Sequence, residues 1–158
     1  MDKNPRVGFG TVDMGAYEAQ YSVRYWAWAA GITNGLTNYT DCAAGDGIPN
    51  LLKYAMGGGP MDSGSAGQVT GSVNVESVPV IHFLRNRNAL DVTMIVQGAD
   101  AITNGVIWQN LAINQGGGWM SEYSFSEDDI GEGLVLCHQQ DAGPLVTNRF
   151  MRLKVTRP

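Results

Sequence analysis

The segment 41–54, DCAAGDGIPNLLKY, carries the residue types of a calcium loop. Loops that wrap Ca²⁺ place oxygen ligands at the first, third, fifth and ninth positions, glycine at the sixth, and an acidic residue at the twelfth. Counted from Cys42, the fifth, sixth and ninth positions are Asp46, Gly47 and Asn50, which fit this pattern. The first and third positions are a thiol and a methyl side chain, which coordinate a hard cation poorly.

The twelfth position of the same loop is Lys53, which puts an ammonium where a bidentate carboxylate would hold the ion. We therefore expect the lysine to replace the ion and to direct its charge at Asp46. The pattern predicts a degenerate and empty metal site, and the alternative that Ca²⁺ binds through Asp46 and Asn50 stays open. No other cofactor is expected.

The two imidazoles of the chain, His82 and His138, each lie inside a segment that reads as a strand. A catalytic triad would need one of them beside a nucleophile and an orienting acid, and no sequence signature of a nucleophile surrounds either. Cys137 is the neighbour of His138, but adjacent strand residues point to opposite faces. We predict no catalytic residues and no enzymatic activity, with a hydrolase fragment as a remote alternative.

The densest carboxylate cluster is Glu127, Asp128 and Asp129. Such a cluster could hold a cation or supply the acid and base of a glycosidase. We expect it instead to form a solvated loop.

Three aromatic residues, Trp119, Tyr123 and Phe125, are the candidate ligand-binding residues. In a single strand these odd-numbered positions would share one face. If that face is outward the rings form a platform for a polysaccharide, and if it is inward they belong to the core. The sequence leaves both readings open.

Composition excludes several classes of partner. The chain has 158 residues, the size of one ordinary domain, and a net charge of −5, which argues against binding nucleic acid. No apolar run reaches membrane-spanning length, and Met1 to Pro5 are too polar for a signal peptide. Cys42 and Cys137 could form one disulfide or remain two buried thiols.

Two short helices are expected before a region of strands. Tyr17, Tyr21, Tyr25 and Trp28 recur at helical spacing, and a second amphipathic helix over 48–57 has an early proline and a glycine stop. After a Gly/Ser-rich connection the predicted strands are 72–75, 78–85, 91–98, 106–112, 118–126, 133–139 and 150–156.

These elements predict a mainly β fold, an antiparallel β-sandwich of the immunoglobulin or jelly-roll kind, with an N-terminal arm and one or two short helices. We place the arm and helical segment at residues 1–60 and the sandwich at residues 61–158. In the last strand polar and apolar residues alternate, so one face should be buried. Trp108 is expected to be a core residue between the sheets.

The run from Asp46 to Gly57, followed by Pro60, resembles the "DGDGIPNLLEYALG" signature of large secreted bacterial surface proteins, where it precedes a β-rich C-terminal module. The run GTVDMGAYE, from Gly10 to Glu18, is similar to the ending of surface-anchored parallel β-helix proteins. The resemblance implies a parent protein that is extracellular or at the cell surface.

The combined interpretation is a noncatalytic structural or adhesive accessory module, with a carbohydrate-binding module as the alternative. A β-helix ending would expose an unpaired strand edge, which a second copy of the chain could cover. We therefore also predict a homo-oligomer.

Overall fold

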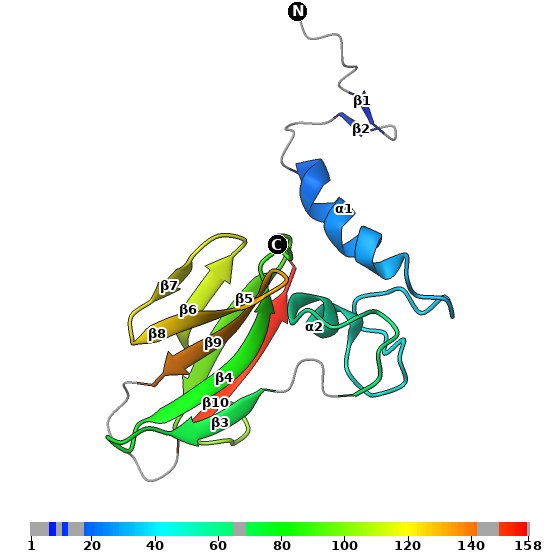
Figure 1. Cartoon of the computed structure of the whole chain (residues 1–158). Helices are drawn as coiled ribbons and strands as arrows, with labels where there is room; N and C mark the ends of the chain where they lie inside the picture. Colours follow the sequence, from blue (N-terminus) through cyan, green and yellow to red (C-terminus); the bar gives the residue numbers. More distant parts are fainter. Residues whose placement is uncertain (1–6, 9–10, 13–17, 65–68, 142–148, 158) are drawn as a thin grey trace, which may run out of the picture.

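The computed structural model describes residues 7–8, 11–12, 18–64, 69–141 and 149–157, with side chains from residue 24 onward. Two four-stranded antiparallel sheets pack against each other around a common core (Figure 1). The strand order is β3-β4-β9-β8 in one sheet and β10-β5-β6-β7 in the other. The predicted fold class, a mainly β sandwich with short helices, is therefore confirmed.

The strands of the sandwich follow one another along the chain after residue 69. They are β3 (Thr70–Val73), β4 (Pro79–Asn86), β5 (Thr93–Ala99), β6 (Gln109–Gln115), β7 (Trp119–Ser121), β8 (Phe125–Gly131), β9 (Leu134–Gln140) and β10 (Phe150–Thr156). Two further short strands, β1 (Val7–Gly8) and β2 (Thr11–Val12), pair with each other antiparallel. Most of the expected N-terminal arm lies outside the described residues.

Alternation along β4 and β9 decides which residues reach the core. Ile81 and Phe83 on β4, and Val135 and Cys137 on β9, are buried between the sheets. Successive strand residues point to opposite faces, so the even-numbered residues of both strands form the outer face of this sheet. In β10 exposed and half-buried residues alternate, as the sequence predicts.

The two helices are α1 (Glu18–Ala29) and α2 (Asn50–Ala55), close to the expected positions. Pro49 precedes α2 with a φ of −59°, which suits a helix start. Gly57 follows it with a φ of +82°, a left-handed conformation that glycine adopts without strain. The predicted glycine stop is confirmed.

The helical segment shares one hydrophobic core with the sandwich. Figure 1 shows α2 against the end of the sandwich, close to β10 and β4. The core cluster contains residues from both parts of the chain, among them Tyr25, Ala29, Tyr54, Ala55, Phe83, Val92 and Met94. The described residues on either side of the predicted boundary at residues 60–61 are thus joined by packing.

One predicted strand, 118–126, is wrong as a single element. Trp119–Ser121 forms β7 and Phe125–Gly131 forms β8, and the two strands belong to different sheets. The Ser121 hydroxyl accepts a hydrogen bond from the backbone N–H of Tyr123 (3.2 Å), a local turn that ends β7. The expected carboxylate loop is also wrong, because Glu127, Asp128 and Asp129 lie within β8.

The expectation that Trp108 is a core residue is also wrong. Its side chain is half-buried just before β6, and the guanidinium carbon of Arg152 lies 4.0 Å from the ring centroid. Arg152 is on the exposed face of β10, so Trp108 lies on the outer side of that sheet. The cation and the amphipathic indole stabilise each other there without burial between the sheets.

Candidate functional site

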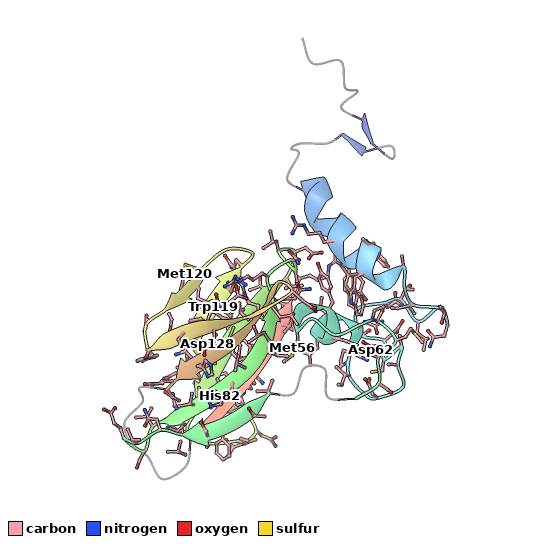
Figure 2. All side chains as sticks on the ribbon, in the orientation of Figure 1. Met56, Asp62, His82, Trp119, Met120 and Asp128 are labelled. Carbon is pink, nitrogen blue, oxygen red and sulfur yellow. The ribbon has the colours of Figure 1, made fainter. Side chains whose placement is uncertain are left out.

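The loop before α2 is organised around a buried ammonium. The Lys53 side chain is 0% exposed, and its Nζ donates to Asp46 Oδ2 at 2.6 Å and to the Asp62 carbonyl at 2.7 Å. Figure 2 shows Asp62 in the loop beside α2. The prediction that Lys53 directs its charge at Asp46 is confirmed, and the ammonium also binds the chain that leaves the helix.

Asp46 is held on two sides. The hydrogen bond from Lys53, and next the backbone N–H of Ile48 at 3.0 Å, lower the pKa of the Asp46 carboxyl below its ordinary value of 3.8. The carboxylate is therefore charged at neutral pH, and its two oxygens have partners within the loop.

Asn50 fixes the other side of the loop. Its side chain is 0% exposed; Nδ2 donates to the carbonyls of Leu36 (2.7 Å) and Asn38 (2.9 Å), and Oδ1 accepts from the Ala43 N–H (3.2 Å). A buried amide with such partners acts as a clamp between backbone segments. Its function is to hold the turn.

The predicted metal ligands do not fit a calcium ion. Ca²⁺ needs six to eight oxygen ligands, but the oxygens of Asp46 and Asn50 already accept hydrogen bonds from the protein. The Lys53 ammonium would also repel the ion. Within the described part of the chain, no group of three or more His, Cys, Asp or Glu residues is arranged to hold a metal.

A buried carboxylate joins the helical segment to the sandwich. Asp91, just before β5, accepts from the Tyr54 hydroxyl (2.6 Å) and from the backbone N–H of Tyr25 (3.0 Å). Burial, and then the bond to Asp91, raise the pKa of Tyr54 far above its ordinary value of 10. Burial likewise raises the pKa of Tyr25 to about 12. Both phenols are therefore neutral donors at physiological pH.

The candidate ligand-binding rings turn toward the core. Trp119 packs against Phe125 from the opposite sheet, with ring centroids 4.6 Å apart, and against Phe83 at 5.8 Å. Trp119, Tyr123 and Phe125 are all half-buried against the core cluster. These three rings therefore do not form an outward platform of the kind that binds a polysaccharide. Polysaccharide binding through them stays a prediction, and their packing does not support it.

Each carboxylate of the cluster has its own partners. Glu127 accepts from the Trp119 indole N–H (2.9 Å) and lies 3.6 Å from Arg85, Asp128 pairs with His138, and Asp129 pairs with Arg87 (2.8 Å). Adjacent residues of β8 point to opposite faces, so Glu127 and Asp128 cannot share a ligand. Each carboxylate of the cluster is thus already engaged by a protein partner.

A polar row crosses the outer face of the β3-β4-β9-β8 sheet. His82 Nδ1 lies 2.6 Å from His138 Nδ1, His82 Nε2 lies 2.6 Å from the Ser72 hydroxyl, and His138 Nε2 lies 3.0 Å from Asp128 Oδ2. Figure 2 shows His82 on β4 and Asp128 beyond β9 on β8. Burial, and then the neighbouring His138, lower the pKa of His82.

Sequence reasoning missed this row. The signal was present only as two histidines in separate strands, and the contact exists because His82 and His138 are direct partners in the β4–β9 register. The row is not a catalytic triad. In a triad the second ring nitrogen of the histidine bonds a carboxylate, but here that nitrogen of His82 faces the imidazole of His138. A hollow of about 410 Å³ between β3–β4 and β10 is lined by Ser72, and neither imidazole is among the residues around it.

The two cysteines are free thiols, so the open alternative of one disulfide is resolved against a bridge. Cys137 is buried on β9, and its burial, followed by the nearby Glu127 carboxylate, raises the pKa of the thiol to about 12. Such a thiol is neutral and unreactive at physiological pH.

Comparisons of the chain with protein-family models, curated proteins and solved structures gave no match. The resemblance to secreted surface proteins therefore stays a prediction. In the described residues no helix is long and apolar enough to cross a membrane.

Proposed function

We propose that the chain is a noncatalytic structural or adhesive accessory module of an exported or cell-surface protein, in which the loop and α2 form a joint that needs no metal. The observation that carries this proposal is the fully buried Lys53 ammonium, which bonds Asp46 and the Asp62 carbonyl. A protein cation thus takes the place that Ca²⁺ has in the loop pattern.

The joint has the properties of a permanent connection. Its charged partners are covalently part of the chain, so its occupancy does not depend on the concentration of an ion. The next residue after Lys53, Tyr54, bonds Asp91 at the edge of the sandwich, so the loop, the helix and the sheet are held in one continuous arrangement. This supports a spacer or mounting role rather than a calcium-regulated one.

Thermal unfolding of the full chain in EDTA and in excess CaCl₂ tests the joint. The expected result is the same Tm in both solutions, because no ligand is gained or lost. A Ca²⁺-dependent increase in Tm would show that the loop binds the ion and would overturn the proposal. Excess MgCl₂ is the control for a general effect of divalent salt.

The noncatalytic part of the proposal is tested at Ser72, the only described serine bonded to an imidazole. Because His82 is followed by a second histidine and not by a carboxylate, we expect no activation of the Ser72 hydroxyl. Hydrolysis of a chromogenic ester should proceed at the same rate with wild type and Ser72→Ala. A faster wild-type rate that Ser72→Ala abolishes would favour the hydrolase alternative.

A second candidate, polysaccharide binding, is favoured by one observation on the other sheet. Beside Trp108, Arg152 Nε donates to Gln97 Oε1 (2.9 Å), and Gln97 Nε2 donates to Asn110 Oδ1 (2.7 Å). A half-buried indole beside fixed amide and guanidinium groups combines an apolar surface with hydrogen-bonding groups, the usual combination in ligand sites.

Retention of the chain on insoluble polysaccharides tests this candidate. Trp108→Ala should abolish retention, and Trp26→Ala, which removes another partly exposed indole on α1, should leave it unchanged. Equal retention of wild type and Trp108→Ala would exclude this face as a glycan site.

A further inference from the structure

The polar row on the β3-β4-β9-β8 sheet brings two imidazole nitrogens together on its outer face. His82 and His138 face each other across adjacent strands, with ring centroids 4.9 Å apart and the ring planes at 80°. Their Nδ1 atoms converge to 2.6 Å. Their Nε2 atoms point away from each other, one toward Ser72 and the other toward Asp128.

Asp128 and Ser72, at the two ends of the row, limit which ring nitrogens of the histidines can carry protons. The Asp128 carboxylate can only accept, so the bond at 3.0 Å places a proton on His138 Nε2. Neutral His138 then presents a bare lone pair at Nδ1. The Ser72 hydroxyl can accept as well as donate, and when it accepts from His82 Nε2, the Nδ1 of His82 is bare too. When the hydroxyl donates instead, His82 Nδ1 carries a proton and donates it to His138 Nδ1. In the first arrangement two lone pairs converge on one point, which a cation can occupy.

We propose that His82 and His138 bind one divalent transition-metal ion through their Nδ1 atoms, with Asp128 and Ser72 as the outer partners that hold the imidazoles in place. Metal-bound histidines commonly donate their second ring N–H to a carboxylate or another acceptor, which fixes the tautomer and orients the ring. Here each Nε2 already has such a partner.

A small opening of the pair accommodates the ion. Metal–nitrogen bonds of about 2.0–2.1 Å at a tetrahedral angle separate the two nitrogens by about 3.3 Å. The rings must therefore part by less than an ångström from their 2.6 Å contact. Both side chains lie on the outer face, and His138 is 25% exposed, so side-chain rotation can supply this change and water can complete the coordination.

The donor set selects the class of metal. Two imidazoles suit Cu²⁺, Ni²⁺ and Zn²⁺, and the general order of affinity makes Cu²⁺ the strongest of these. Ca²⁺ prefers oxygen ligands and gains little from two nitrogens. Only two protein donors reach the ion, so the site is open to water or to a further ligand and differs from a closed structural zinc site.

Titration of the metal-free full chain with CuCl₂ tests the proposal, by calorimetry and by electron paramagnetic resonance. The expected result is one Cu²⁺ per chain with hyperfine coupling to two nitrogens. Because the chain has only two histidines, His82→Ala and His138→Ala should each weaken binding at least tenfold. Asp128→Asn should weaken it by roughly tenfold through loss of the outer partner.

The control variants separate this site from other donors. Cys42→Ser removes the half-exposed thiol and should leave Cu²⁺ affinity unchanged, as should Asp46→Asn in the loop. Circular dichroism of each variant confirms that the sandwich is retained. The proposal is overturned if Cu²⁺ does not bind, if binding survives His82→Ala, or if Cys42→Ser removes it.

Discussion

The loop before α2 and the histidine row on the outer sheet use similar groups in opposite environments. In the loop, Lys53 meets Asp46 with its side chain fully buried, whereas in the row His138 meets an Asp128 side chain that is 69% exposed. A buried charge without its partner is costly, while an exposed one is solvated by water. The Lys53 ammonium is therefore held by its present partners, whereas the side chains of the histidine row can exchange a protein partner for water or another ligand.

The comparison shows why residue type alone does not distinguish a site from a support. Asp46 and Asn50 look like metal ligands in the sequence, but both are occupied by the protein itself. The two histidines carry no motif, yet they converge on one accessible point. Accessibility of the lone pairs, set by packing, determines which group of residues can bind a ligand.

The largest effect is expected from Lys53→Met, which keeps the size of the buried side chain and removes its charge. Asp46 and the Asp62 carbonyl then lose their common donor, and a partner of a buried pair is left uncompensated. The Tm should fall by on the order of 10 °C in scanning calorimetry. Lys154→Met, on the exposed face of β10, is the matched control and should change the Tm little.

If Lys53→Met has the same Tm as wild type, the buried ammonium contributes no more to stability than a surface charge. The two regions would then not differ in the way described.

Tyr54→Phe should have the next largest effect, because it breaks the bond between the helical segment and buried Asp91. A hydrogen bond to a charged acceptor contributes about 2 kcal/mol, so urea unfolding should show a loss of that size. Tyr25→Phe removes a bond to a neutral acceptor, the Thr37 carbonyl, and should lose about 1 kcal/mol. Equal losses would show that the charge of Asp91 is unimportant at this joint.

The loop should also respond to acid through Asp46. Its folded pKa lies below the ordinary value of 3.8, so its contribution to stability is present above that pH and is lost as the pH falls through the folded pKa. The Tm difference between wild type and Asp46→Asn should therefore be constant near neutrality and shrink below about pH 4. A difference that grows in acid would have the wrong sign for this ion pair.

The smallest effect is expected from Asp128→Asn in the absence of metal. The carboxylate is largely exposed, so its pair with His138 should contribute within about 0.5 kcal/mol of zero. Urea unfolding of metal-free protein measures this. A loss comparable to that of Lys53→Met would mean that the row is a structural element, and the two regions would no longer differ.

Much of the fold was predictable because its signals are local. Alternation marks β10 within 150–156, the proline and glycine mark the ends of α2, and the loop pattern places Lys53 seven residues after Asp46. Charge and turn chemistry over so short a distance depend little on the rest of the chain. The sandwich class follows from the number of such strands.

The errors arose where two sheets meet. The run from 118 to 126 alternates like one strand, but the turn at Ser121 sends Trp119 and Phe125 to different sheets, where their rings meet across the core. Trp108 is large and apolar enough for a core, but Arg152 binds it on the outside. Neither outcome is visible in a pattern of polarity, because both depend on which strands become neighbours.

Local sequence signals were enough to predict the two helices, most of the strands and the ion pair of the loop, since these result from residues a few positions apart. The contacts between His82 and His138, 56 residues apart, and between Tyr54 and Asp91, 37 residues apart, depend on the assembled sheets. The physical reason is strand register: a shift of one residue would turn every side chain of a strand to the other face, and the register is fixed by the packing of the whole sheet.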